Sequence, residues 1–187
     1  MNFELSEEQQ MVRAAVREFA QNEIAPRARE YDEAEKFPSE QLKGLAEMGL
    51  LGMIIPDEYG GAGFDSVSYA VALEEIARAD ASVAVIVSVT NSVCCYPILT
   101  RGTEQQKQKF LVPLARGEKL GAFCLTEPQA GSDAANLKMR ASEDGDFYVL
   151  NGTKSWVTSG GRADVHIVMA VTGETNGKKE ITAFIVE

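Results

Sequence analysis

FCLTEPQAGSD, residues 123–133, is the stretch that decides how this chain is interpreted. Its apolar start predicts a short strand, and the residues that follow predict a polar turn and then a tight bend at Gly131-Ser132-Asp133. A strand that ends in this way directs a hydroxyl and several backbone N–H groups toward one place. Such a strand end suits a flat, electron-poor ligand with many acceptor atoms.

A second segment of the same kind, KSWVTSGG, occupies residues 154–161. If it is a strand, Trp156 and Thr158 lie on one face, because side chains of a strand alternate. An aromatic plane and a hydroxyl donor on one face suit a conjugated ring, which the indole packs against and the hydroxyl binds. The structural alternatives are a core role for the tryptophan and simple β-propensity for the threonine.

The residues of the first segment leave similar alternatives open. Phe123 and Leu125 share a strand face and Thr126 points the other way, so either the turn reorients its hydroxyl or its N–H binds the ligand. Gly131 and Ser132 form a simple turn, or they place a hydroxyl beside a bound acyl chain or phosphate.

Size and charge restrict the class of protein. The chain has 187 residues, 45% hydrophobic and 25% charged, which predicts a globular protein of one large or two small domains. A formal net charge of −10 argues against nucleic-acid binding. We expect no membrane span, because no run approaches eighteen consecutive apolar residues.

The cysteines and the N-terminus indicate a reduced, cytoplasmic protein. Cys94 and Cys95 are adjacent, Cys124 is isolated, and no metal-ligand spacing occurs. The acidic start at residues 1–8 lacks the basic and apolar regions of a signal peptide.

The first part of the chain predicts helices. Ser6 and Gln9 form a capping box, Pro26 kinks or ends the first helix, and Gly49 closes the second. Asp65 caps a further helix, and Thr103 with Gln106 caps the last. The run 82–99 combines β-branched residues with a length that favours a buried helix, for which Ser82 is a plausible N-cap. The glycine-rich stretch 56–63 lacks the context of a phosphate loop.

After Gly117 the pattern changes to short apolar runs at 120–126, 139–142, 147–150, 165–171 and 181–186. Asp144-Gly145, Asn151-Gly152 and Asn176-Gly177 are hairpin signals between them. The predicted fold class is therefore α+β, with an all-helical domain over 1–117 and an antiparallel, barrel-like β domain over 118–187. The β domain is incomplete, because its last strand ends without a closing turn and exposes an edge.

The carboxylates and the histidine offer little catalytic chemistry. Glu127 is either a general base or the partner of a cation, and Glu74-Glu75 is most simply a solvated helix face. His166 is the only histidine and reads as structural, so no Ser-His-Asp triad is possible within this chain. The sequence indicates no catalytic residue and no metal site.

Together, these segments resemble the acyl-CoA dehydrogenase family, and most closely its bacterial short-chain, butyryl-CoA type. The two segments 123–133 and 154–161 match the family's flavin signatures, and the resemblance covers the whole chain. The other matching stretches, in the family's order, are 5–9, 56–63, 91–99 and 102–107. Asn136 departs from the pattern, since a small residue usually stands there.

The resemblance implies FAD as cofactor, a short- to medium-chain acyl-CoA thioester as substrate, and α,β-dehydrogenation in fatty acid β-oxidation. It implies that Phe123, Cys124, Leu125, Thr126 and Gly131 line the flavin, with Thr126 on the pyrimidine side. Trp156, Val157 and Thr158 would form the second flavin segment, with the Thr158 hydroxyl at N5. Ser132 would touch both FAD and the bound substrate.

The resemblance also implies an electron-transfer flavoprotein as acceptor and a homotetramer. Family members continue into a second helical domain that supplies the catalytic glutamate, so this chain alone should be inactive. The sequence leaves two alternatives open: an oxidase or monooxygenase of the same fold, or a short, non-catalytic homologue that binds acyl-CoA.

Overall fold

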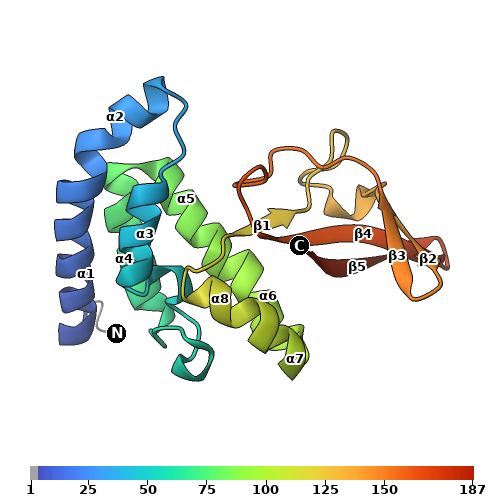
Figure 1. The fold of residues 1–187 in the computed structure, drawn as a ribbon, viewed down its shortest axis with the longest axis horizontal. Helices are drawn as coiled ribbons and strands as arrows, with labels where there is room; N and C mark the ends of the chain where they lie inside the picture. The colour runs from blue at the N-terminus through green and yellow to red at the C-terminus, as the bar shows by residue number, and fades with distance from the viewer. Residues whose placement is uncertain (1–3) are drawn as a thin grey trace. The chain divides into compact units, whose positions relative to one another are not determined.

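The computed structural model describes residues 4–187, which form two compact units (Figure 1). The first unit extends to Lys119 and is helical, and the second begins at Leu120 and contains a sheet. Each unit has its own hydrophobic residues in its interior.

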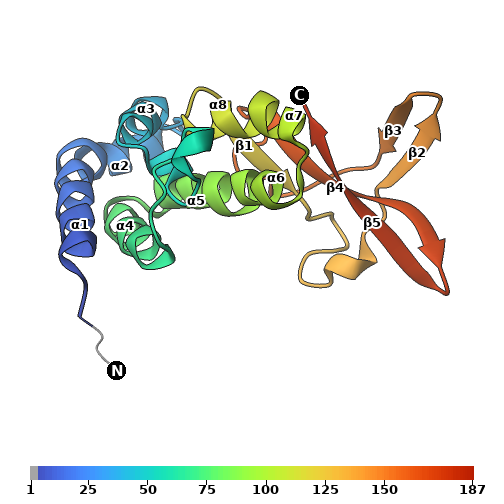
Figure 2. The same cartoon turned by 90° about the horizontal axis from the view of Figure 1, so that it is seen from below.

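The helical unit begins with one long, modified helix. Its parts follow one another without a break and are α1 (Glu7–Phe19), the π-helical η1 (Ala20–Ile24) and α2 (Ala25–Glu33). Pro26 stands in the first turn of α2, directly after the π-helical residues, so the helix continues through a π-bulge at the proline instead of ending there. Figure 2 shows α1 lying beside α4 (Ser66–Ala79).

The remaining helices are short or interrupted. They are α3 (Ser39–Glu47), η2 (Leu50–Gly52), η3 (Asp57–Tyr59), α5 (Ala81–Val89), η4 (Thr90–Cys95), α6 (Tyr96–Arg101), α7 (Glu104–Gln106), η5 (Lys107–Leu111) and α8 (Val112–Ala115). The elements α5, η4 and α6 follow one another directly, so the apolar run is helical, as predicted from its length.

Most of the predicted helix caps are confirmed. Ser6 and Gln9 make a reciprocal capping box, and so do Thr103 and Gln106. Asp65 accepts from the Ser68 N–H. The predicted N-cap at Ser82 is wrong, because Asp80 caps α5 and also accepts from the Ser82 hydroxyl. A carboxylate two residues earlier therefore takes the role predicted for Ser82, because it accepts from the backbone N–H groups of Ser82 and Val83.

The interpretation of Glu74-Glu75 as a solvated face is half wrong. Glu74 is exposed, but Glu75 is buried and forms a bidentate ion pair with Arg17 of α1, at 2.6 and 2.9 Å. This pair joins α1 to α4, and the guanidinium lowers the pKa of the Glu75 carboxyl.

The glycine-rich stretch 56–63 uses its N–H groups internally. The N–H groups of Ala62 and Gly63 donate to the carbonyls of Gly52 and Ile55. A Cβ on Gly61 would lie 2.1 Å from the Ile55 carbonyl oxygen, so only glycine fits. This loop folds onto its own chain, which leaves these donors unavailable to a phosphate.

One described helical stretch, Ala81–Arg101, is long and apolar enough to cross a membrane by length and composition. Half of an apolar 18-residue window within this 21-residue stretch is buried inside the protein. The core helix of a globular unit passes the same test, so the stretch is weak evidence for a span.

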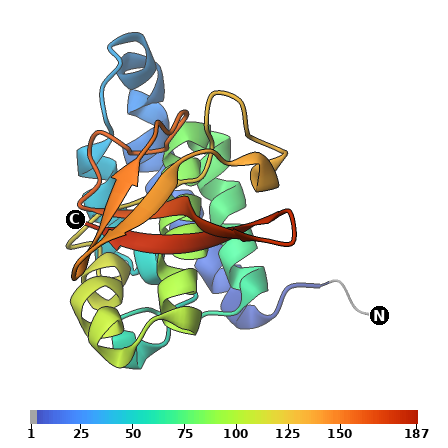
Figure 3. The same cartoon turned by 90° about the vertical axis from the view of Figure 1, so that its right-hand side faces the viewer.

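The second unit contains a mixed sheet, which corrects the predicted antiparallel arrangement. Its strands are β1 (Gly121–Cys124), β2 (Arg140–Asp144), β3 (Phe147–Asn151), β4 (Val165–Thr175) and β5 (Lys178–Val186). β1 and β2 pair with β4 in parallel, whereas β2–β3 and β4–β5 are antiparallel. Figure 3 shows the β2–β3 strands in orange and the β4–β5 strands in red. The sheet does not close on itself, so the barrel-like description is wrong for the described residues.

Two of the three hairpin signals are confirmed. Asp144-Gly145 turns β2 into β3, and Asn176-Gly177 turns β4 into β5. Asn151-Gly152 makes no hairpin, because residues 152–164 form an irregular segment before β4. The Asn151-Gly152 signal therefore predicted the end of β3 correctly, but the hairpin that was predicted to follow it is wrong.

The helical unit depends on one buried amide. Asn91 of η4 accepts from the Met53 N–H at 2.7 Å and donates to the carbonyls of Leu50 and Val87 at 2.8 and 3.0 Å. Met53 and Leu50 are fully or almost fully buried. The side chain therefore substitutes for backbone partners that η2 and its flank lack.

Asn91→Ala should lower the free energy of unfolding by roughly 2–4 kcal/mol, since each buried backbone group left unpaired costs about 1–3 kcal/mol. Chemical denaturation measures the change. The control Asn22→Ala removes an exposed amide of η1 and should stay within about 0.5 kcal/mol of the parent. Equal effects of the two substitutions would contradict the role of Asn91.

Candidate functional site

The first segment leaves the sheet where β1 ends at Cys124. The Cys124 side chain is buried, and burial raises the pKa of its thiol. Leu125 packs against the buried cluster of Ala130, Leu137 and Val171. The Cys124 side chain is therefore largely inaccessible, whereas Leu125 is half-buried and packs on one side against the interior of the β unit.

The second segment is a loop, which corrects the expected strand with Trp156 and Thr158 on one face. Residues 152–164 carry no regular strand pairing, and Trp156 and Ser159 have positive φ angles of 58° and 61°. Positive φ at two non-glycine residues so close together is a strained backbone, which is typical of functional sites. The Trp156 side chain is 93% exposed in the structure, so it is not a core residue of the described chain.

A buried ion pair joins the two segments. The Lys154 ammonium lies 2.9 Å from Oε1 of Glu127 and donates to the Leu125 carbonyl at 3.0 Å. The next residue, Ser155, donates its N–H to the Thr126 carbonyl at 2.8 Å. The side chains of Glu127 and Lys154 are only 3% and 7% exposed. We call these three contacts the clasp.

Glu127 is saturated with hydrogen bonds. Besides Lys154, it accepts from the N–H groups of Lys138 and Met139 at 2.7 and 2.9 Å, and from the Gln129 amide at 2.5 Å. Burial alone would raise the pKa of the carboxyl, but Lys154 and these donors lower it to about 2. The structure therefore favours the interpretation of Glu127 as the partner of a cation.

The clasp leaves polar groups of both segments without internal partners. Within residues 4–187, no hydrogen bond uses the hydroxyl of Thr126, Ser132 or Thr158. The Ser159 hydroxyl is buried and has no hydrogen-bond partner among the described residues. Gly131 and Ser132 are exposed, and Phe123, Thr126, Val157 and Thr158 are half-buried. The clasp links the two segments at Thr126 and Ser155, so the unpaired donors belong to segments that are held together.

The irregular segment returns along β1 to reach β4. At its start the Ser155 N–H binds the Thr126 carbonyl, just past the end of β1, and near its end the Asp164 N–H donates to the Leu120 carbonyl, just before β1 begins. A ring nitrogen of His166 lies 3.1 Å from the Gly160 carbonyl oxygen, which fits the structural role predicted for it. The parallel pairing of β1 and β4 requires such a return.

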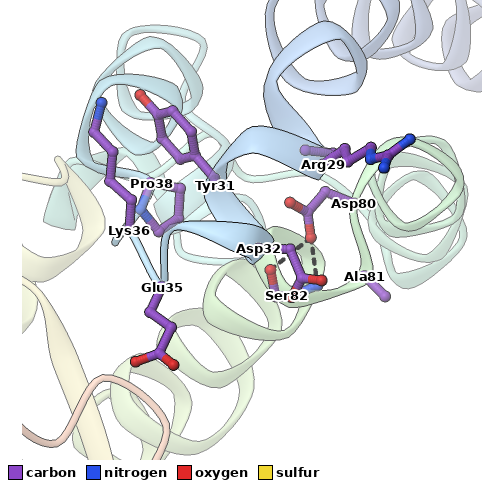
Figure 4. A pocket seen from close by; sticks show the side chains of 10 residues that line it. Arg29, Tyr31, Asp32, Glu35, Lys36, Pro38, Asp80, Ala81 and Ser82 are labelled. Atoms are coloured by element: carbon purple, nitrogen blue, oxygen red, sulfur yellow. Dashed lines mark hydrogen bonds between the residues drawn. The ribbon is translucent and has the colours of Figure 1, made fainter.

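A separate cleft of about 660 Å³ lies in the helical unit (Figure 4). Its lining includes charges of both signs, among them Arg29, Asp32, Glu35 and Lys36. Asp80 at its edge is already used to cap α5, as the dashed bonds to Ser82 show. None of the predicted site residues lines this cleft, so the clasped segments remain the candidate site.

Sequence reasoning missed the clasp itself. Lys154 was part of the quoted motif but had no assigned role, and Gln129, Lys138 and Met139 were not singled out. The available signal was a lysine and a glutamate in two segments that were already expected to share a ligand. No group of three or more His, Cys, Asp or Glu within the described residues could hold a metal ion.

Comparison with protein families matches the model "Acyl-CoA dehydrogenase, N-terminal domain" at residues 6–118 and the model "Acyl-CoA dehydrogenase, middle domain" at residues 122–187. The chain is 49% identical over 187 residues to the short-chain specific acyl-CoA dehydrogenase of Clostridium acetobutylicum. This alignment covers 100% of the chain and 49% of the relative, so the chain spans about half the length of this relative.

Two solved structures of acyl-CoA dehydrogenases are also similar to this chain over about half of their own length. Butyryl-CoA dehydrogenase from Megasphaera elsdenii superposes with a TM-score of 0.93 at 43% identity, covering 100% of this chain and 50% of that one. A glutaryl-CoA dehydrogenase from Mycobacterium smegmatis, solved in complex with FADH2, gives a TM-score of 0.91 at 37% identity and covers 97% and 46%.

The stability supplied by Glu127 should depend on pH. Its pKa is about 2 in the folded state against an ordinary 4.5, so its contribution is complete above about pH 4.5 and is lost as the pH falls toward 2. At pH 7, Glu127→Gln should cost roughly 3 kcal/mol, because the Lys154 ammonium stays buried without its counter-charge. Denaturation at several pH values should show this difference shrinking below pH 4.5.

The matched control is Glu143→Gln, which alters an exposed carboxylate that accepts from the Tyr148 hydroxyl. Its effect should stay below about 0.5 kcal/mol. A pH-independent cost of Glu127→Gln would show that the buried pair contributes no charge-dependent stability.

Proposed function

Because this chain belongs to the acyl-CoA dehydrogenase family, we propose that it provides flavin- and thioester-binding residues of an FAD-dependent enzyme. The reaction is the α,β-dehydrogenation of a short- to medium-chain acyl-CoA to the 2-enoyl-CoA, a step of fatty acid β-oxidation. The relative from Clostridium acetobutylicum is about twice as long, so the activity belongs to the whole protein.

One observation carries the proposal: the clasp holds together two segments that present an exposed aromatic ring and hydroxyl groups without hydrogen-bond partners among the described residues. Trp156 offers an indole plane that is 93% exposed, and the hydroxyls of Thr126 and Thr158 make no hydrogen bond within the described residues. A flat ring with several acceptor atoms satisfies both requirements. The residues present therefore fit a flavin, and the resemblance specifies FAD.

Each residue has a distinct task in this proposal. Thr158 donates its hydroxyl toward flavin N5, and Thr126 donates on the pyrimidine side. Trp156 and Val157 cover the ring and exclude water from it. Phe123, Cys124, Leu125 and Gly131 line the flavin, and Ser132 contacts both the cofactor and the thioester. A bound FAD supplies the acceptor for the hydride that leaves the β carbon.

Glu127 does not remove the α proton in this scheme. A general base works best when its pKa lies near the operating pH, and the pKa of Glu127 is about 2. Four donors also occupy its two oxygens. The base is therefore a carboxylate outside this chain, as the resemblance implies.

The remaining assignments follow from the resemblance. We propose an electron-transfer flavoprotein as the electron acceptor, a homotetramer as the assembly and the cytoplasm as the location. Mass photometry and cell fractionation test the last two. Oxygen consumption during turnover tests the acceptor, because an oxidase of the same fold would reduce oxygen.

The whole protein should carry a flavin spectrum and release FAD on denaturation. Anaerobic addition of butyryl-CoA should bleach the flavin absorption, because the flavin is reduced as the thioester is oxidised. With FAD saturating, Glu127→Gln should still be bleached at a rate within about tenfold of the parent, whereas removal of a true general base costs about 10²–10⁴-fold. A protein without flavin, or one that butyryl-CoA does not bleach, contradicts the proposal.

Thr158→Val keeps the side-chain shape and removes the donor. It should weaken flavin binding or slow reduction by the equivalent of about 0.5–1.5 kcal/mol, the net worth of a neutral hydrogen bond. Flavin fluorescence titration and stopped-flow reduction measure the two effects. Thr153→Val, on an exposed residue before the second segment, is the control and should change neither. Parent-like affinity and rate in Thr158→Val would exclude the role at N5.

A further inference from the structure

The two side chains of the buried ion pair, Glu127 and Lys154, are held in place by different contacts. Glu127 is held to its own part of the chain by Gln129 and by the N–H groups of Lys138 and Met139, independently of the second segment. Lys154 alone extends from the second segment, with its ammonium between Glu127 and the Leu125 carbonyl. The position of the second segment relative to the first therefore depends on this ammonium and on the adjacent Ser155–Thr126 bond.

The contacts occur beside the proposed flavin-binding groups. The two carbonyls that the second segment binds belong to Leu125 and Thr126. On the other side, Thr158 lies four residues after Lys154, beyond the positive-φ residue Trp156. A small shift of Lys154 would therefore move both threonine hydroxyls relative to each other.

From this geometry we propose that Lys154 and Glu127 are positioning residues for the flavin, which set the relative placement of Thr126 and Thr158. This inference rests on the proposed function and assigns the pair a role that its contribution to stability does not require. A buried ion pair is weak evidence for stability, because desolvation of the two charges offsets much of their attraction. Its other use is to specify one arrangement among several, which is what two separate hydroxyl donors need.

The pair is also asymmetric. The Glu127 oxygens serve two backbone N–H groups that a lysine in the same place would leave unsatisfied. The Lys154 ammonium serves a carbonyl that a glutamate in the same place would repel. Exchanging the two charges would therefore break these contacts with the backbone. This is expected of an ion pair that fixes the position of the backbone.

The decisive variant is the double substitution Glu127→Gln/Lys154→Met in the whole protein. It removes both charges and leaves no unpaired buried ion, while the new amide oxygen at position 127 can still accept from one of the two backbone N–H groups that the two carboxylate oxygens serve. The double variant should therefore lose less stability than Lys154→Met, which leaves the Glu127 carboxylate buried without its counter-charge. The thioether that replaces the ammonium cannot donate to the Leu125 carbonyl, so the flavin dissociation constant should rise by at least about tenfold, which corresponds to the loss of about one well-placed hydrogen bond between the segments.

The single variant Lys154→Met and the control Phe184→Leu complete the experiment. Phe184 lies on β5, contacts the Tyr148 ring and makes none of the clasp's contacts. Phe184→Leu should lower stability and leave the flavin dissociation constant and absorption spectrum unchanged. Lys154→Met should weaken flavin binding at least as much as the double variant does.

Three results would overturn the positioning role. They are parent-like flavin affinity in the double variant, failure of the double variant to fold, and equal loss of affinity in Phe184→Leu. A parent protein that binds no flavin would instead overturn the proposed function, so the two failures are distinguishable.

Discussion

The ion pair between Glu127 and Lys154 is the interaction on which the candidate site depends. Both side chains are almost completely buried, so neither charge is tolerated without the other. Glu127 also satisfies the N–H groups of Lys138 and Met139, which have no strand partner there. One carboxylate thus fixes the turn that follows β1, the approach to β2 and the second polar segment.

The sheet explains why such a pair is needed. A parallel neighbour cannot be joined to β1 by a tight turn, so the chain makes the β2–β3 hairpin and then returns along β1 before β4 begins. That return consists of residues 152–164, which lack a regular ladder of their own. The Lys154 ammonium and a few isolated backbone hydrogen bonds, such as those from Ser155 and Asp164, hold it in place instead.

The helical unit is also held by two kinds of contact: local contacts between near neighbours in the sequence, and contacts between residues far apart in the sequence. Its caps use side chains within three residues of the groups they satisfy, as in the Ser6–Gln9 box. Asn91, by contrast, binds backbone groups 38 and 41 residues away. The Arg17–Glu75 pair spans 58 residues. Caps define where the helices start, whereas these distant contacts hold the unit together.

The sequence by itself determined what short-range chemistry controls: the capped helices, the hairpins at Asp144-Gly145 and Asn176-Gly177, and the two segments that carry the family signatures. Only the tertiary structure decided the parallel pairing of β1, the loop conformation of Trp156 and the burial of Glu75. It also decided between the two interpretations of Glu127, which is an ion-pair partner and not a candidate base. The physical reason is distance along the chain, since a cap or a two-residue turn is completed by its neighbours. Lys154 meets Glu127 across 27 residues, and no local pattern reports that contact.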